Sequence, residues 1–355
     1  MSKKRRLRWI VGIGSVILIA ATWFYLAKLT PSADIRDYAR CYIDDDRETG
    51  SGEVKVTYLG TSSLLIEDGS TQLMVDGFLS RPGVPFLLVL GVETDTGRVI
   101  RALKRASVDS VSAVFVAHSH YDHALDAAYV ARYTKAQLYG SPSTLNTGRW
   151  AGLDPNSAKR FEPGKLMEFG DFRVTVLHAS HSPQKKFIAD AGQHILKQIP
   201  ELTKDSAPAR VKQSRYREGG SYDLLIRHGT LTILVKPSAN WVPGVLDGVQ
   251  ADVVFLGVGT LGAQDTSFQR AYYEQTVRKV RPRLVIPIHW DDPTTTLSEQ
   301  LEANPRILDN VETTFDSLIA RTRRDSIGFG ILQGYASVVF PRELIHTRTC
   351  QKAAD

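Results

Sequence analysis

The chain has 355 residues, which is enough for one large α/β domain or two ordinary ones. Its formal net charge is +6, but six of the 44 basic residues lie in residues 1–28, where there is no acidic residue. The remaining 38 basic residues balance the 38 acidic ones, so the composition predicts no nucleic-acid partner.

The N-terminal segment predicts a membrane anchor. A basic cluster precedes an uncharged apolar run at residues 9–26, and about 17–25 such residues span a bilayer as a helix. The run exceeds the roughly 7–15 apolar residues of an ordinary signal peptide, although a cleaved signal and a secreted product remain the alternative. The positive-inside rule then puts the rest of the chain on the periplasmic or extracytoplasmic side of the inner membrane, held by a single pass. We assign 1–30 to the basic tail and anchor or signal, and 31–52 to a linker.

Residues 53–345 have the pattern of one α/β domain, followed by a tail at 346–355. Three β-rich runs at 54–59, 63–67 and 73–76 are separated by turn residues, which predicts consecutive antiparallel strands. Further strands are expected at 111–117, 137–139, 172–178, 222–227, 231–235, 252–256 and 283–288, and helices at 96–106, 124–131, 268–280 and 297–303.

A basic insertion at 184–217 stands apart from the rest of the domain. It has eight basic and three acidic residues, and its apolar residues recur at near-helical spacing. This pattern indicates either a lid over a site or a basic face toward anionic lipid. A solvated surface insertion explains it equally well.

The chain has two cysteines, Cys41 near its beginning and Cys350 near its end. In an oxidising compartment this pair could form a disulfide that ties the two ends of the domain together. Two unrelated free thiols are the alternative.

The residues that say most about chemistry are His118, His120, Asp122 and His123, which fall within six positions of the chain. An apolar β-rich stretch precedes this run and an alanine-rich stretch follows it, so a strand would deliver the cluster to a loop. Neutral imidazole nitrogens and carboxylate oxygens are the usual ligands of catalytic zinc. The run therefore predicts a metal site. His178, His181 and His289 also lie at or just past the C-terminal ends of expected strands, where catalytic residues gather in α/β folds.

The motif His118-x-His120-x-Asp122-His123, a later His past a strand, and the final Pro287-Ile288-His289-Trp290 resemble the metallo-β-lactamase superfamily. Within it, the branch that holds ascorbate-6-phosphate lactonase and N-acyl-phosphatidylethanolamine phospholipase D is the most similar. The runs at 58–63 and 73–80 also look like the opening strands of that branch. The resemblance covers roughly residues 53–300 and implies a four-layer αββα sandwich, here preceded by the transmembrane helix.

The resemblance also implies a ligand set for two metal ions. His118, His120 and a third His would bind the first ion, and His181 fits the third role better than His178 because it lies past the strand. Asp122, His123 and His289 would bind the second ion, and Asp122 could also accept a proton from the attacking water. Asp76 would orient the histidine loop, because a ligating His usually needs a partner on its other nitrogen. Two zinc ions per chain are expected, with one ion, or iron or manganese, as alternatives.

One position departs from the superfamily's pattern. Ser238 stands where a bridging Asp is expected, and a neutral hydroxyl is a poor zinc ligand. This change is compatible with three alternatives: the other ligands hold two metal ions, they hold one metal ion, or the protein has no catalytic activity. Asp265, Asp291 or Asp292 could substitute for the missing carboxylate in space.

These observations together predict a membrane-anchored, metal-dependent hydrolase that uses a metal-bound hydroxide. The expected substrate is a phosphodiester or a lipid-derived ester, and the expected partners are a small-molecule or lipid substrate and the membrane itself through residues 9–26. A lactonase of the same fold is the enzymatic alternative. A catalytically degenerate envelope scaffold or binding protein is the alternative from another class, because one fold hosts many functions.

Overall fold

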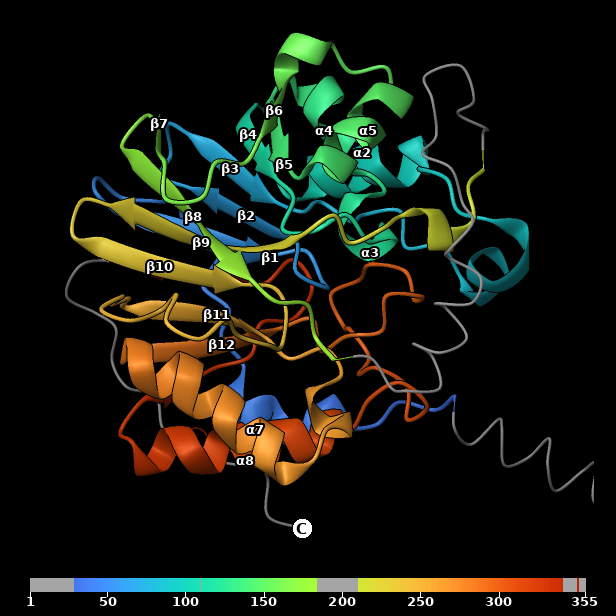
Figure 1. The fold of residues 1–355 in the computed structure, drawn as a ribbon. Helices are drawn as coiled ribbons and strands as arrows, with labels where there is room; N and C mark the ends of the chain where they lie inside the picture. Colours follow the sequence, from blue (N-terminus) through green and yellow to red (C-terminus); the bar gives the residue numbers. More distant parts are fainter. Residues whose placement is uncertain (1–28, 109, 184–209, 341–349, 351–355) are drawn as a thin grey trace, which may run out of the picture.

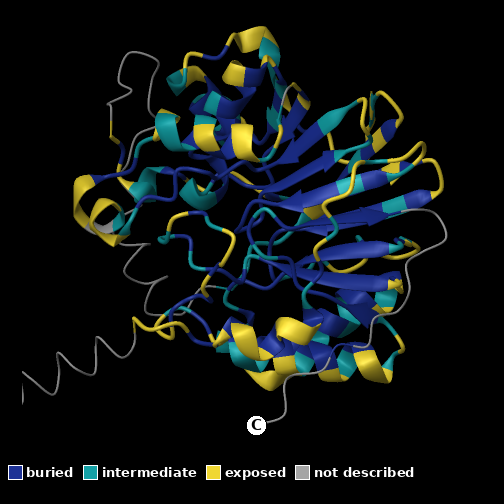
Figure 2. Ribbon diagram, turned by 180° about the vertical axis from the view of Figure 1, so that it is seen from behind, coloured by how far each residue is buried: buried dark blue, intermediate teal, exposed yellow. Residues whose placement is uncertain are grey.

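The computed structural model describes residues 29–108, 110–183, 210–340 and 350. Two seven-stranded sheets pack face to face, as Figure 1 shows, and helices cover the outer face of each sheet. The predicted four-layer sandwich therefore describes the arrangement of the domain. Most of the strands in both sheets are buried, and the exposed residues concentrate in the helices and loops (Figure 2).

The first sheet has the strand order β14-β1-β2-β3-β4-β5-β6. Its strands are β14 (Ser337–Phe340), β1 (Val54–Tyr58), β2 (Leu64–Glu67), β3 (Gln72–Val75), β4 (Val111–Phe115), β5 (Gln137–Gly140) and β6 (Ala158–Arg160). The pairs β1–β2 and β2–β3 are antiparallel, which confirms the prediction for the first three strands. The following pairs, β3–β4 and β4–β5, are parallel.

The second sheet has the order β13-β12-β11-β10-β9-β8-β7. Its strands are β13 (Gly328–Phe329), β12 (Leu284–Ile288), β11 (Val253–Gly257), β10 (Leu231–Lys236), β9 (Ser221–His228), β8 (Phe172–Ala179) and β7 (Leu166–Phe169). All five residues of β11 and all five of β12 are buried, which explains why these strands are continuous apolar runs in the sequence.

The helices divide between the two outer faces. The first sheet is covered by α2 (Thr96–Arg105), α4 (Ala127–Thr134) and α5 (Pro142–Trp150), and the second by α7 (Thr266–Tyr273) and α8 (Val311–Arg324) (Figure 1). The one-turn helix α3 (Tyr121–Ala124) precedes α4 at the edge of the sandwich. The 3-10 helix η1 (Ile35–Cys41) falls in the predicted linker and packs on α8, where the rings of Tyr38 and Phe315 lie 5.3 Å apart.

Two predicted elements need correction. Among the residues that the structure describes, no helix is both long enough and apolar enough to span a membrane. The predicted fold is therefore corrected to the two-sheet domain without such a helix; residues 9–26, on which that part rested, lie outside the described residues. The helix expected at 297–303 is also wrong, because this stretch is irregular and contains an isolated bridge between Asp291 and Ala303. Its apolar spacing reflects the burial of Leu297 and Leu301 in a loop.

The predicted insertion is described only in part. Residues 184–209 lie outside the described residues, and 210–217 contain the short helix η5 (Gln213–Arg215). Here Val211 forms a bridge with Val92, so this end of the segment is joined to the loop that follows β3.

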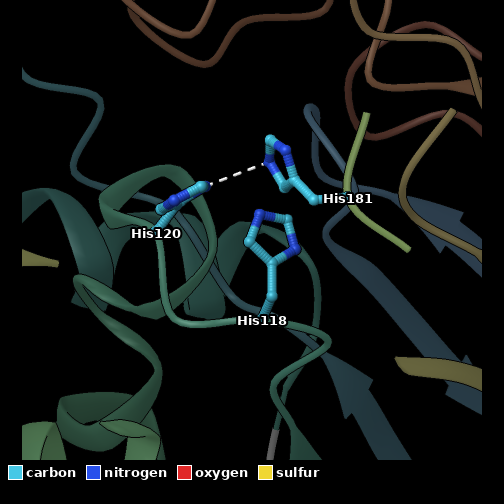
Figure 3. Close-up of side chains that lie close together, drawn as sticks. All are labelled: His118, His120 and His181. Carbon is cyan, nitrogen blue, oxygen red and sulfur yellow. Dashed lines mark hydrogen bonds between the residues drawn. The ribbon is translucent and has the colours of Figure 1, made fainter. Parts of the chain in front are cut away.

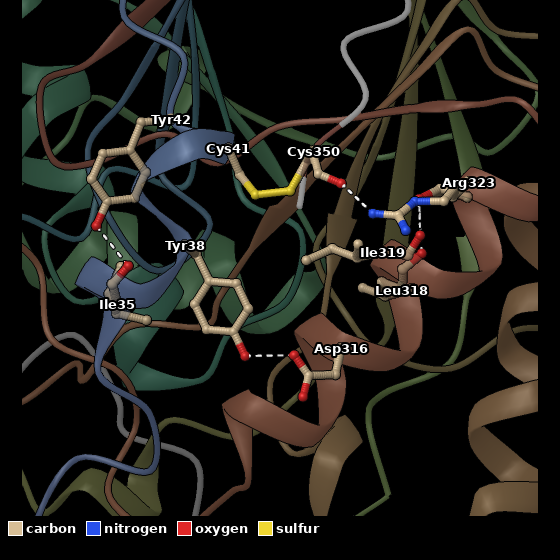
Figure 4. Close-up of a disulfide and its surroundings, with 10 residues drawn as sticks. Ile35, Tyr38, Cys41, Tyr42, Asp316, Leu318, Ile319, Arg323 and Cys350 are labelled. Atoms are coloured by element: carbon tan, nitrogen blue, oxygen red, sulfur yellow. Dashed lines mark hydrogen bonds between the residues drawn. A yellow bond between two sulfur atoms is a disulfide. The ribbon is translucent and has the colours of Figure 1, made fainter. Parts of the chain in front are cut away.

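Cys41 and Cys350 are bonded to each other as a disulfide, with their Cα atoms 4.9 Å apart (Figure 4). Both residues are buried, and Arg323 of α8 donates a hydrogen bond to the carbonyl oxygen of Cys350 at 3.1 Å. The bond therefore ties the chain at η1 to its C-terminal end against α8.

We expect the double variant Cys41→Ala/Cys350→Ala to lower the free energy of unfolding by roughly 2–5 kcal/mol, because the bond closes a loop of 309 residues and restricts the unfolded chain. Urea denaturation of the variant and of the oxidised and reduced wild type measures this effect. Equal midpoints for the oxidised and reduced wild type would contradict the prediction.

Candidate metal centre

The first sheet delivers the histidine motif to one edge of the sandwich. β4 ends at Phe115, and His118 and His120 lie in the loop that follows it. His120 then caps α3, and the single turn of this helix carries Asp122 and His123. The change from extended loop to helical turn directs these side chains to two neighbouring positions.

The first group consists of His118, His120 and His181, whose rings converge in Figure 3. His120 Nδ1 and His181 Nε2 lie 3.1 Å apart. The ring centroid of His118 lies 4.8 Å from each of the other two centroids. His181 comes from the loop after β8 in the second sheet, so the group joins the two halves of the sandwich.

The second group consists of Asp122, His123 and His289. His289 Nε2 lies 3.2 Å from His123 Nε2 and 3.3 Å from Asp122 Oδ2. His289 follows β12 and has a left-handed backbone, with φ of 65°. The two groups adjoin, since the ring centroids of His118 and His123 are 3.8 Å apart.

The donor atoms fit a transition-metal ion. Two ligand atoms at about 2.0–2.1 Å from one tetrahedral zinc lie about 3.3 Å from each other, close to the 3.1–3.3 Å separations within the groups. Within the described part of the chain, neither ring nitrogen of buried His118 has a hydrogen-bond partner. Buried polar atoms normally have one, so a metal would supply the interaction that the protein lacks.

The pKa values of His118, His120 and Asp122 favour the protonation states that bind metal. Burial and the neighbouring imidazoles hold the pKa of His118 well below its usual value, and burial with His181 lowers the pKa of His120 to about 4. Burial alone would raise the pKa of Asp122, but His123 and His289 lower it below its ordinary range. Neutral imidazoles and an ionised carboxylate are the forms that bind metals.

Hydrogen bonds orient the ligating rings. Asp76, at φ 58°, accepts from His123 Nδ1 at 2.8 Å and from the hydroxyl of Ser62 at 2.5 Å. His181 Nδ1 lies 2.8 Å from the carbonyl oxygen of Ser182, which leaves Nε2 directed at the first group. These contacts fix which nitrogen of each ring is available.

The segment after β10 contacts the His181 loop but adds no carboxylate to either group. Ser238 is buried, and its neighbour Ala239 donates its N–H to Ser182 Oγ at 2.7 Å. The Asn240 amide donates to the carbonyl oxygen of His181 at 2.8 Å. This segment therefore supports the loop that carries His181.

None of the three carboxylates considered as substitutes joins the described metal groups. Asp265 caps α7 by accepting from the N–H of Phe268, and Asp292 accepts from the N–H and hydroxyl of Thr294. Both oxygens of Asp291 accept hydrogen bonds, from Tyr58 and Thr61 on one side and Arg81 on the other. The change at Ser238 is thus not compensated by these residues.

Among the described residues, His178 and His228 lie outside both groups. His178 is exposed on β8, three residues before His181. A third group, Asp68, Asp171 and His228, brings ligand-type atoms together where turns of the two sheets meet. There His228 Nε2 and Asp68 Oδ2 lie 3.1 Å apart, so the imidazole already has a hydrogen-bond partner.

The sequence analysis missed Ser62, Arg81 and Asn240, which contact the ligands or their loops. Only Arg81 carried a signal in the sequence, because it is a charged residue in a mostly apolar stretch.

Comparison with known proteins finds similarity to the superfamily that the motifs resemble. Residues 56–212 match the family model of the metallo-β-lactamase superfamily. This match covers the histidine motif and His181.

The chain is also similar in sequence to proteins named UPF0173 metal-dependent hydrolase. One from Ruegeria sp. (strain TM1040) is 26% identical over 36% of this chain and 49% of its own length, so the chain spans about half of that relative. One from Cupriavidus necator is 25% identical over 72% of this chain and 78% of its own length. Among solved structures, the metallo hydrolase Igni18 from Ignicoccus hospitalis is 14% identical, with a TM-score of 0.49, over 82% of this chain and all of that chain.

We expect Asp76→Asn to lower the affinity of the second group for Zn²⁺ by roughly 10–100-fold, because the amide nitrogen cannot accept the bonds that hold His123. Competition with a chromophoric chelator measures the affinity. Asp68→Asn is the matched control, since Asp68 also pairs with an imidazole, that of His228, outside the two groups. An equal loss in both variants would contradict the assignment.

Proposed function

We propose that this protein is a hydrolase whose six ligands hold two metal ions, zinc in the first instance, with iron or manganese as alternatives. The observation that carries the proposal is the pair of adjoining three-ligand groups, His118–His120–His181 and Asp122–His123–His289. Their donor set of five imidazoles and one carboxylate suits zinc or iron. The metal-dependent hydrolases among its relatives support the same class.

When bound, the metals would supply Lewis acidity and lower the pKa of a coordinated water toward neutrality. The chain's own residues hold this chemistry in place. Asp122 Oδ2 lies 3.3 Å from His289 Nε2, and Asp122 is the one carboxylate in the two groups. It could therefore both bind the second metal ion and accept a proton from the attacking water. Asp76 keeps His123 in one orientation through the bond to Nδ1.

For the substrate we propose an ester or phosphodiester with an apolar part, as in a lipid-derived molecule. Exposed apolar side chains support this choice: Val84, Phe86, Val89 and Leu90, the last three in the short helix η2 (Phe86–Leu90). This helix lies in the loop that begins at Asp76 and on the same side of the sandwich as α3 (Figure 1). Exposed apolar patches commonly mark binding surfaces.

We also propose that the domain works outside the cytoplasm. The bond between Cys41 and Cys350 supports this location, because structural disulfides persist in oxidising compartments and are rare in reducing ones.

Metal analysis of the purified full-length protein, followed by assays on esters, phosphodiesters and lactones, tests the proposed activity. We expect close to two ions per chain, and we expect His120→Ala to abolish turnover because it removes a ligand of the first group. His178→Ala is the control and should keep both metal and turnover, since His178 lies outside the groups. No metal, even when it is offered in excess, would favour a scaffold or binding protein instead.

The double variant Phe86→Ser/Val89→Ser tests the apolar substrate. We expect a higher KM for a long-chain ester and an unchanged KM for a short-chain, water-soluble ester, because only the longer substrate would reach the patch. An unchanged KM for both substrates would contradict the role of η2.

A further inference from the structure

A buried ion pair lies behind the second metal group. Arg81 follows β3 and is 1% exposed, and Asp291 follows β12 and is fully buried. The Arg81 guanidinium donates through Nη2 to Asp291 Oδ2. Asp291 lies two residues after His289, so the pair links the loop after β3 directly to the loop that carries this ligand.

The pair is part of a network that uses both carboxylate oxygens. Asp291 Oδ1 accepts from the hydroxyl of Tyr58 at 2.5 Å and from the N–H of Thr61 at 2.8 Å. Arg81 Nη2 also donates to Thr61 Oγ1 at 3.0 Å, and Arg81 Nη1 donates to the carbonyl oxygen of Asp292 at 3.4 Å. Three separate loops, after β1, β3 and β12, are therefore joined at one point.

The same network fixes the backbone at His289. The N–H of His289 donates to the carbonyl oxygen of Thr61 and lies 3.3 Å from the Tyr58 hydroxyl. His289, Thr61 and Arg81 all have left-handed backbones, with φ of 65°, 55° and 46°. Such conformations are strained for residues other than glycine and persist only where the surroundings hold them.

Glycine is required beside the pair. Gly60 has φ of +79°, and a Cβ there would lie 3.0 Å from Asp291 Oδ2 and in collision with the Arg81 guanidinium. The chain thus leaves space for the guanidinium against its backbone.

Stability alone is a poor explanation for this arrangement. Removing two charges from water costs several kcal/mol per ion, and apolar residues of similar volume often replace a buried ion pair without loss. What apolar residues cannot supply is a set of directed bonds to three loops.

We propose that Arg81 and Asp291 are positioning residues that hold His289 against Asp122 and His123, and thereby complete the second metal group. The proposal rests on the proposed metal centre. It predicts that disturbing the ion pair weakens binding of one ion and spares the other, since no hydrogen bond or ion pair within the described residues joins the His118–His120–His181 group to this network.

Zn²⁺ titration of full-length Arg81→Met against a chelator tests this role. We expect two ions per wild-type chain, and in the variant a loss of about 10–100-fold in affinity for one ion with the other unchanged. Arg81→Lys keeps the charge but not the forked geometry, so it should fold and show a smaller loss at the same ion. If Arg81→Met does not fold, Arg81→Lys tests the proposal by the same measure, which is a loss of affinity for one zinc ion while the other is unchanged.

The matched control is Lys236→Met, which breaks the other buried ion pair that a Lys or Arg makes in the described residues, between Lys236 Nζ and Asp223 Oδ2 at 3.0 Å. This pair lies beside Tyr272 of α7. We expect it to lower the melting temperature while both zinc affinities stay at wild-type values. Wild-type affinities in the Arg81 variants, or the same selective loss in Lys236→Met, would overturn the proposal. A wild type that binds neither zinc nor, in parallel titrations, iron or manganese would instead overturn the proposed function.

Discussion

The carboxylate of Asp76 is the interaction on which the rest of the centre depends. Its two oxygens accept bonds from the Ala117 N–H at 2.8 Å, from the Ser62 hydroxyl and from the His123 ring. It therefore joins the end of β4, the loop after β1 and one ligand of the second group. These atoms are buried. The loss of any one of these hydrogen bonds would therefore leave an unsatisfied polar group and lower the free energy of unfolding by about 1–3 kcal/mol. The carboxylate thus holds the position of the histidine loop before any metal binds.

Three carboxylates at this edge of the sandwich, of which Asp76 and Asp291 are fully buried, have different partners and therefore different capacities. Asp76 and Asp291 have both oxygens engaged by donors of the protein. Asp122 instead faces the imidazoles of His123 and His289 and is the one that joins a metal group. The resemblance implied a metal ligand at Asp122 and an orienting role for Asp76, but it left Asp291 as a possible substitute ligand. The distribution of donors around them decides which one is available to a metal.

The strands were predictable because their apolar alternation and turn residues are local signals, and the first three strands lie within one or two residues of the expected positions. The helix expected at 297–303 failed for the opposite reason: Leu297 and Leu301 are buried by packing of an irregular loop, and burial alone does not specify helix. The helix α8 was not among the predicted elements, although it is 14 residues long and buries residues at helical spacing, such as Val311, Phe315 and Leu318. Asn240 and Arg81 could not be assigned, because their partners are distant in the chain.

The sequence by itself determined the cluster of His118, His120, Asp122 and His123, because these residues lie within a single loop and turn whose spacing is visible in one dimension. The resemblance also pointed to His181 and His289, but only the tertiary structure brings these two distant residues to the cluster and leaves out the three carboxylates proposed to replace Ser238. It also decided that Cys41 and Cys350 meet. The physical reason is that these contacts depend on how two sheets pack and where loops from separate strands end, which no local pattern of residues records.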